Sequence, residues 1–257
     1  MHRFYLAPEG WNSDLLILGR AETHHARTVL RLQPGASVLV FDGEGREVTG
    51  EVVSLEREKT RIRPVQESLT PPSSCHITLA QAVPKGRQMD LIIQKGVELG
   101  VSVMVPLITA RTIVQADERK SEKWRQLAIE AAKQCGQKWL PRIQAPQSVA
   151  EYFRTNPAHD LRLVGSLGTD AISLKNVLTA QLRAGRKRPG NVLICIGPEG
   201  DFTPEELQLA QDHACIPVSF GPIVLRVETA SIYCLSVLSY ELSDRAGAGN
   251  VKAGQGG

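Results

Sequence analysis

The sequence has 257 residues, of which 42% are apolar, so it is long enough for two domains or one large domain with a packed core. Its net charge of +3 is too small to indicate a polyanion partner by itself, and its longest apolar runs have the length of strands, not of membrane spans. The amino terminus lacks the charged start and apolar middle of a signal peptide, and the five cysteines show no C-x-x-C spacing, so we expect a cytoplasmic protein without membrane or metal partners.

The first 70 residues consist mostly of short apolar runs separated by turn residues, as in "SVLVFDGEGREVTGEVVSL". This pattern predicts a small β-barrel domain over residues 1–70. Within it, "DGEG" at 42–45 joins two strand-like runs and is typical of a hairpin. The stretch "AETHHARTVLRL" inserts one helix, which we expect to be closed by Pro34 and Gly35.

Four residues of that helix are candidates for RNA binding. His24 and His25 are adjacent and therefore diverge by about 100° around a helix, so they cannot both face one metal ion. Together with Arg27 and Arg31 they could form a stripe that faces RNA. The alternative is an ordinary surface helix with one half-buried histidine, which is the commoner outcome.

A second domain follows the linker "ESLTPPSSCH", whose prolines and serines resist both helix and central strand. Beyond it, strand-like runs alternate with helical patterns, which predicts a parallel α/β sheet within a domain at 77–243. The expected strands are 77–83, 103–109, 161–167, 191–197 and 216–220. Residues 244–257 are rich in glycine, and we expect them to be a disordered tail.

Two predicted helices of this domain differ in their apolar patterns. The helix at 119–135 has apolar residues at helical spacing on one side and cations on the other, so it packs on one side only. The helix at 230–242 is apolar nearly all round, which predicts burial in the sheet layer or against a second subunit.

The middle of the chain is the most basic part. Residues 85–142 hold eleven Lys or Arg against six Asp or Glu, so this segment is an electrostatic candidate for RNA binding. Lys85 and Arg111 are its two candidate contacts. The alternative for each is an ordinary solvated charge.

The stretch "ICIGPEGDFTPEE" at 194–206 reads as a buried strand, a loop and a helix. Thr203 to Glu206 form a capping box, with Pro204 at the first helical position. The Gly-Pro-Glu-Gly part permits close approach of a ligand to the backbone. The stretch carries four carboxylates that would repel a phosphate, so it favours a neutral or cationic ligand. They belong to Glu199, Asp201, Glu205 and Glu206.

A second Gly-Pro loop lies in "VSFGPIVLRVETA" at 218–230, where we expect Glu228 or Thr229 to cap the last helix. Both loops follow strands of the predicted sheet, and ligands bind at the carboxyl ends of such strands. The chain has no G-x-G-x-x-G and no P-loop motif, which disfavours phosphorylated nucleotide cofactors. With apolar Ile223 and Leu225 and the cation Arg226 between the loops, a purine-bearing ligand without phosphates would fit.

These motifs resemble those of the SPOUT methyltransferases, most closely the RsmE type, which uses S-adenosylmethionine to methylate N3 of a specific uridine in 16S ribosomal RNA. One such segment would be a weak signal, whereas six in the same order are a specific one. The six segments are "HHARTVLRLQPGASVLVFDG", "PKGRQMDLIIQKGVELGV", "LITARTIV", "KWRQLAIEAAKQCG", "IGPEGDFTPEE" and "FGPIVLRVETA".

The resemblance implies a PUA-like barrel followed by an α/β methyltransferase domain with a deep trefoil knot. It also implies a homodimer that acts on 16S rRNA, within the small ribosomal subunit. The cofactor-binding positions that it implies are Gly165, Ile196, Gly197, Pro198, Glu199, Gly200, Gly221, Ile223, Leu225 and Arg226. The chain departs from the family pattern in two places, because Asp201 stands where a second glycine is usual and Val227 where a threonine is usual.

Two residues are candidates for catalysis of methyl transfer to uracil N3. Arg226 stays charged and could stabilise the anionic uracil that develops as the proton leaves. Glu228 or a water molecule could accept the proton, although a carboxylate at a helix start is also favoured by the helix dipole alone.

Two other classes of function compete with this interpretation. One is a non-catalytic RNA-binding or ribosome-assembly protein, which the two Gly-Pro loops and Arg226 disfavour. The other is an α/β enzyme that uses a phosphorylated nucleotide, which the acidic loop and the missing glycine motif disfavour.

Overall fold

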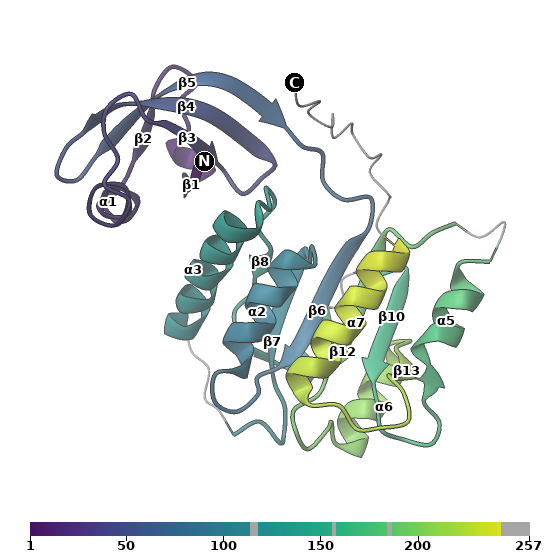
Figure 1. The fold of residues 1–257 in the computed structure, drawn as a ribbon. Coiled ribbons are helices and arrows are strands. Elements are labelled where there is room, and N and C mark those ends of the chain that lie inside the picture. Colours follow the sequence, from purple (N-terminus) through teal and green to yellow (C-terminus); the bar gives the residue numbers. More distant parts are fainter. Residues whose placement is uncertain (114–117, 156–157, 184–186, 243–257) are drawn as a thin grey trace. The chain divides into compact units, whose positions relative to one another are not determined.

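Two β-sheets organise the computed structural model, which describes residues 1–113, 118–155, 158–183 and 187–242 (Figure 1). The chain divides into two compact units, which we describe separately. The first unit comprises Met1–Pro72, Asp90–Met104 and Ala116–Ala145, and the second comprises Ser73–Met89, Val105–Gln115 and Pro146–Gly257.

The sheet of the first unit has five strands in the order β1-β3-β4-β5-β2, and it curls into a half-barrel (Figure 1). The strands are β1 (His2–Tyr5), β2 (Leu16–Leu18), β3 (Ser37–Phe41), β4 (Arg46–Leu55) and β5 (Thr60–Leu69). β1 pairs with β3 in parallel, and the other pairs are antiparallel. Val38 and Val40 on β3 are buried whereas Ser37 is exposed, which is the alternation expected of a half-buried strand. The predicted PUA-like barrel is therefore an open, curled sheet.

The predicted hairpin at 42–45 is confirmed, because these residues connect antiparallel β3 and β4. Gly43 and Gly45 have φ of +80° and +96°, values that glycine adopts without steric cost. The Asp42 carboxylate accepts hydrogen bonds from the backbone N–H groups of Glu44 (2.7 Å) and Arg46 (3.0 Å), which fixes the turn.

The predicted helix after β2 is shorter than expected. α1 (Arg20–His24) continues as one π-helical turn over His25–Val29, and Arg31 then adopts a left-handed conformation with φ of +51°. An L-residue in that conformation ends a right-handed helix, so the helix stops before Pro34 and Gly35.

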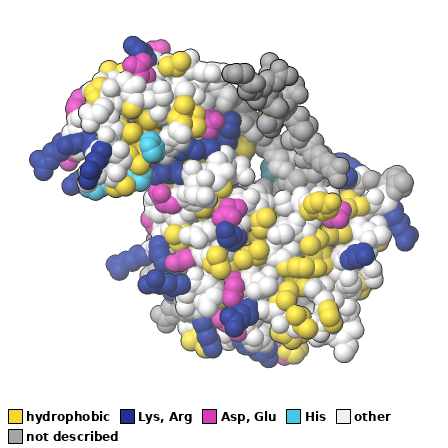
Figure 2. All heavy atoms as spheres, in the orientation of Figure 1, with side chains coloured by type: hydrophobic (Ala, Val, Ile, Leu, Met, Phe, Trp, Pro, Cys, Tyr) yellow, Lys and Arg dark blue, Asp and Glu magenta, His cyan; other side chains and the backbone are white. Residues whose placement is uncertain are grey.

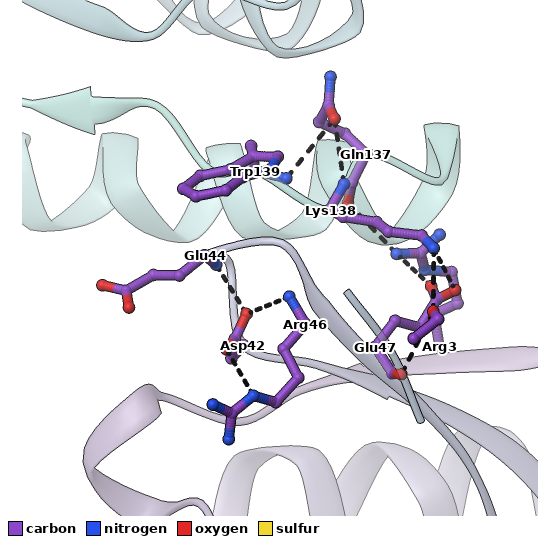
Figure 3. A network of polar contacts seen from close by, with 9 residues as sticks. Arg3, Asp42, Glu44, Arg46, Glu47, Gln137, Lys138 and Trp139 are labelled. Carbon is purple, nitrogen blue, oxygen red and sulfur yellow. Dashed lines mark hydrogen bonds and ion pairs between the residues drawn. The ribbon is translucent and has the colours of Figure 1, made fainter. Parts of the chain in front are cut away.

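Within the first unit, the segment that follows α3 (Glu118–Cys135) is bonded to the hairpin (Figure 3). Glu47 forms ion pairs with Arg3 (3.0 Å) and with Lys138 (3.1 Å), and all three side chains are largely shielded from solvent. The Trp139 indole N–H donates to the carbonyl of Thr70 at 3.0 Å. These contacts join the start of the chain, the hairpin and residues 137–139.

The second sheet has eight strands, with the order β11-β13-β10-β12-β6-β7-β8 and β9 paired to β7. Its strands are β6 (His76–Ala82), β7 (Val103–Ile108), β8 (Arg142–Ile143), β9 (Gln147–Ser148), β10 (Leu161–Gly165), β11 (Ile172–Ser173), β12 (Asn191–Ile196) and β13 (Ile216–Ser219). The pairings of β10, β11, β12 and β13 are all parallel. Each of the five strands predicted after the linker is present within two residues of its expected ends.

The helices between these strands are α2 (Gln88–Glu98), α3 (Glu118–Cys135), α4 (Val149–Thr155), α5 (Leu174–Gln181), α6 (Pro204–Asp212) and α7 (Val227–Leu242). α3 matches the helix predicted at 119–135, with Trp124 buried, but Cys135 is exposed, in contrast to the other four cysteines. α7 packs on β12, yet Tyr233 and Tyr240 on its other side are exposed. The sheet alone therefore does not bury α7 all round, and the predicted alternative, burial against a second subunit, stays a prediction.

Among the residues that the structure describes, no helix combines the length and the apolar character needed to span a bilayer. The tail predicted at 244–257 lies outside the described residues. The domain boundaries at 70 and 77 and the knot stay predictions.

Candidate active site

A pocket of about 770 Å³ opens where three strands of the parallel sheet end. Its walls come from the loops after β10, β12 and β13 and from the first turn of α7, all within the second unit. Carboxyl ends of parallel strands meet at one edge of a sheet, which is where open α/β sheets bind ligands. The lining includes Gly165, Ile196, Gly197, Pro198, Glu199, Gly221, Ile223, Leu225, Arg226 and Glu228. Only Gly200 of the predicted cofactor set lies outside this lining, in the same loop.

The loop after β12 is tightly packed. Gly197 and Pro198 are buried, and a Cβ atom on Gly197 would lie 3.0 Å from Asp201 Oδ1 and 3.1 Å from the Phe202 nitrogen. Asp201 donates its backbone N–H to the carbonyl of Pro198 at 2.9 Å, which closes the turn. Close packing within the loop therefore favours glycine at position 197.

The acidic side chains of this loop mostly bind backbone N–H groups. Glu199 accepts from Lys85 (2.9 Å), and Asp201 accepts from Phe202 (2.8 Å) and from Leu167 (3.3 Å). These carboxylates therefore hold neighbouring loops together. This role is separate from any preference that their negative charge gives the pocket for a cationic ligand.

The predicted capping box at the start of α6 is confirmed. Thr203 Oγ1 accepts from the Glu206 N–H at 3.3 Å, and Glu206 Oε2 accepts from the Thr203 N–H at 2.9 Å. The other oxygen of Glu206 accepts from the Ala110 N–H at 2.8 Å, so the box also holds the loop after β7. Hydrogen bonding at the helix start lowers the pKa of Glu205, which stays ionised.

Arg111, a predicted RNA contact, points at the β12 loop. Its guanidinium donates to the carbonyls of Gly200 and Phe202. A Cβ atom on Gly200 would lie 3.2 Å from Arg111 Cδ, so the two residues pack closely. In this structure Arg111 supports the loop that lines the pocket, and its contact with RNA stays a prediction.

The loop after β13 forms the opposite wall and leads into α7. Ile223 and Val224 are 71% and 72% exposed, and Gly221 has a φ of +131°. The expected cap at Glu228 or Thr229 is wrong, because α7 begins at Val227. The carbonyl of Arg226 accepts the Ala230 N–H at 2.8 Å, so Arg226 itself occupies the N-cap position, with its side chain exposed at the pocket.

A buried hydrogen bond anchors α7 on the sheet. Ser231 Oγ lies 2.5 Å from Gln81 Oε1, and both side chains are fully buried. The Gln81 amide also donates to the Ala82 carbonyl at 3.0 Å. Because buried polar groups are costly without partners, this pair fixes the position of the helix that carries Arg226 and Glu228.

The β10 loop is the third wall. A Cβ atom on Gly165 would lie 3.1 Å from the Phe220 ring and 3.3 Å from Ile196, so glycine lets these neighbours close over it.

The cysteines near the pocket do not suggest nucleophilic chemistry. The Cys215 thiol and burial raise the pKa of Cys195, which leaves it protonated and unsuited to nucleophilic attack. In the described ranges no three His, Cys, Asp or Glu side chains group as metal ligands.

The other predicted RNA contacts lie in both units. Lys85 is exposed on the second unit. On the first, His24, Arg27 and Arg31 are exposed along α1 and the turn after it, whereas His25 is half-buried, edge-on to Phe4 at 6.3 Å. Burial, reinforced by Lys133, lowers the pKa of His25 and keeps its imidazole neutral near pH 7.

Comparison with known proteins identifies the family. A model described as an RNA methyltransferase domain matches residues 71–239, and one described as an RNA methyltransferase PUA domain matches residues 18–65. The chain is 30% identical to the ribosomal RNA small subunit methyltransferase E of Synechocystis sp. over 93% of this chain and 77% of the relative. The chain belongs to the RsmE family of RNA methyltransferases. The Bacillus subtilis member is also 30% identical, over 86% of this chain and 88% of its own.

Two solved structures of similar proteins agree with this fold. The Neisseria gonorrhoeae enzyme, solved with S-adenosylmethionine, matches with a TM-score of 0.83 and 30% identity over 95% of this chain and 99% of that chain. A methyltransferase structure from Legionella pneumophila, also with S-adenosylmethionine, matches with a TM-score of 0.82 and 32% identity over 94% and 98% of the two chains.

Sequence reasoning about this RsmE-family chain missed several residues that shape the pocket. The sequence singles out Asp201 as one of four carboxylates and as a departure from the family pattern, but it does not predict the contact with Leu167. Gln81 and Ser231 were also missed. The signal for Gln81 was a polar residue inside the apolar run of β6, because a buried polar side chain requires a specific partner.

Proposed function

We propose that this chain transfers a methyl group from S-adenosylmethionine to N3 of a uridine in 16S rRNA, uridine 1498 in the usual numbering. One observation carries the proposal: in an RsmE-family chain, Arg226 and Glu228 line a pocket formed by the loops of three parallel strands. Two similar structures contain S-adenosylmethionine, which makes that molecule the first candidate for this pocket.

The residues present fit that cofactor. A volume of about 770 Å³ lies within the range of small-molecule sites. Ile223 and Leu225 offer apolar surface to a purine, and the closely packed Gly165 and Gly197 let backbone N–H and C=O groups face the ligand. Glu199, at the wall, offers a carboxylate to a cationic sulfonium.

The chemistry required of the protein is positioning and charge stabilisation. S-adenosylmethionine, when bound, supplies an electrophilic methyl group on its sulfonium. The guanidinium of Arg226 stabilises the negative charge that develops on uracil as N3 loses its proton. Glu228, in the first turn of α7 and in the pocket lining, is our candidate to accept that proton, either directly or through a water molecule.

The proposed RNA contacts on the first unit are cationic and exposed. Figure 2 shows Lys, Arg and His side chains gathered over α1, where the exposed residues include Arg20, His24 and Arg27. Phosphate contacts of this kind make RNA affinity fall steeply with salt. We propose that this surface binds 16S rRNA within the small ribosomal subunit, in the cytoplasm.

We also propose that the protein acts as a homodimer. Figure 2 shows hydrophobic side chains on the surface over α7, where Tyr240 is 77% exposed and Tyr233 is 46% exposed. Ile223 and Val224 add exposed apolar surface on the β13 loop of the same unit. A second copy that covers these residues would remove apolar area from water.

The proposed function is tested by incubating the protein with S-adenosylmethionine labelled on its methyl group and small ribosomal subunits that lack the modification. Mass spectrometry of the digested rRNA should then find one labelled 3-methyluridine, and the Arg226→Ala variant should form it at least about a hundredfold more slowly. Label on another base, or on no base, would contradict the proposal, and RNA binding without transfer would instead support a ribosome-assembly role.

A further inference from the structure

The loops after β10 and β12 meet through one side chain, that of Asp201. One carboxylate oxygen accepts the backbone N–H of Leu167 at 3.3 Å, and the other accepts the N–H of Phe202 at 2.8 Å. Leu167 lies 34 residues before Asp201 in the chain, and both residues line the pocket. The side chain therefore joins two walls that approach the pocket from different strands.

The backbone of Asp201 has an unusual conformation that the side-chain contacts support. Its φ is +62°, in the left-handed region where glycine is favoured and where Asp and Asn are tolerated better than other residues. A residue with a side chain persists in that region when its surroundings hold it there. Here the surroundings are the two N–H groups bound by the carboxylate.

The carboxylate also explains the packing of the β12 loop. Asp201 Oδ1 lies 3.0 Å from the position that a Cβ atom of Gly197 would take, which leaves little room for a side chain there. On the other side of the loop, Arg111 donates to the carbonyl of Gly200. The Gly-Pro-Glu-Gly turn is thus held from two directions, by the Asp201 carboxylate and by the Arg111 guanidinium.

We infer that Asp201 is a positioning residue that fixes the β10 loop against the β12 loop and so shapes the cofactor site before the cofactor binds. The inference rests on the proposed function, since it concerns the affinity of the same pocket for S-adenosylmethionine. A site formed in advance binds more tightly, because less conformational freedom is lost on binding. The effect falls on cofactor affinity and leaves the methyl-transfer step itself unchanged.

Two substitutions separate the carboxylate from the backbone conformation. Asp201→Gly removes both acceptors but suits a φ of +62°, so the fold is retained. Asp201→Asn tolerates the same φ and keeps one acceptor oxygen. Glu205→Gln is the matched control, because it removes one negative charge from the same stretch at an exposed position that does not line the pocket.

Isothermal titration calorimetry with S-adenosylmethionine and steady-state kinetics on small subunits test the inference. We expect the dissociation constant and the cofactor KM to rise about three- to tenfold in Asp201→Gly, less in Asp201→Asn, and not at all in Glu205→Gln. At saturating cofactor, kcat should stay within about twofold of the original in all three.

An Asp201→Gly variant that binds the cofactor as tightly as the original protein would overturn the inference, as would a fall in kcat at saturating cofactor with KM unchanged. If Asp201→Gly unfolds, Asp201→Asn decides by the same criteria. Failure of the unmodified protein to bind S-adenosylmethionine is a separate result, which would contradict the proposed function and the inference with it.

Discussion

The two Gly-Pro loops of the pocket resemble each other in sequence and differ in how the protein holds them. The β12 loop is fixed by side chains, with Glu199 bound to the Lys85 N–H, Asp201 to the Leu167 N–H, and Arg111 to the Gly200 carbonyl. For the β13 loop from Phe220 to Leu225, the described part of the chain provides no side-chain hydrogen bond, and Ile223 is 71% exposed. One wall is therefore preformed, whereas the other offers apolar surface to whatever binds there.

This difference assigns different tasks to the two walls. A preformed wall determines where a cofactor lies, because it does not have to be ordered on binding. A wall with exposed apolar side chains gains stability when a ligand or a second subunit covers it. Arg226 follows the second wall directly, at the start of α7, so the group proposed to stabilise the uracil anion is exposed to solvent at the pocket.

The largest effect is expected from Arg226→Ala, which tests the role of the second wall. The change removes the charge that we propose to stabilise the uracil anion, so kcat should fall by about 10²–10³. Cofactor affinity should change much less, because the first wall is intact. Single-turnover methylation and calorimetry measure the two quantities, and Arg226→Lys, which keeps the charge, is the control. Activity close to that of the original protein would remove Arg226 from the mechanism.

Gly197→Ala should have the next largest effect. It tests whether the first wall is as tightly packed as the structure indicates. The new Cβ atom would lie 3.0 Å from Asp201 Oδ1 and 3.1 Å from the Phe202 nitrogen. Overpacking of this kind costs about 1–3 kcal/mol of unfolding free energy, and cofactor affinity should fall at least about tenfold. Urea denaturation and calorimetry provide the measurements.

The control for this change is Gly19→Ala. A Cβ atom on Gly19 would meet nothing within 4 Å, and the φ of Gly19 is −76°. Gly19 is the N-cap of α1, where alanine caps less well than glycine, so stability should fall by up to about 1 kcal/mol while cofactor affinity stays unchanged. Equal cofactor affinities for the two variants would show that the β12 loop is looser than described.

Thr203→Ala should have a smaller effect, because it removes only the cap of α6 at the end of the first wall. The Thr203 hydroxyl accepts one N–H at 3.3 Å, and loss of such a cap costs about 1 kcal/mol. The midpoint of urea denaturation should fall accordingly, with the slope unchanged. Thr203→Ser keeps the acceptor and should behave like the original protein, and an equal loss in both variants would argue against the cap.

The smallest effect on the fold is expected from changing Ile223 and Val224 together to Ser, since both side chains are more than 70% exposed. Unfolding free energy should change by no more than about 0.5 kcal/mol for each substitution. If a second copy covers this wall, the dimer should weaken, and light scattering coupled to gel filtration measures this. A large loss of stability in a monomeric variant would mean that the loop is packed within the chain.

The sequence predicted the parallel sheet well because its strands are continuous apolar runs, such as the buried residues of β12. It also predicted the capping box, since Thr203, Pro204 and Glu206 carry a local signal that needs no tertiary contact. For α7 the expected cap was wrong, and the sheet alone does not bury the helix all round. The start at Val227 depends on the turn that precedes it, and the exposed Tyr233 and Tyr240 follow from packing that one helix pattern does not specify.

The candidate site was only partly predictable, because several of its contacts join segments that lie far apart in the sequence. Residues within one motif, such as Gly197 and Arg226, could be singled out from their neighbours in sequence. The contacts of Asp201 with Leu167, of Ser231 with Gln81, and of Arg111 with Gly200 each join segments at least 34 residues apart. No local pattern contains such a pair, so only the folded chain shows it.

Calorimetric titration of the purified chain with S-adenosylmethionine, its demethylated product, ATP and NAD tests the central claim most directly. The account predicts saturable binding of the first two at one site per chain, and no binding of ATP or NAD. Binding of either phosphorylated nucleotide, with no heat from S-adenosylmethionine, would contradict it.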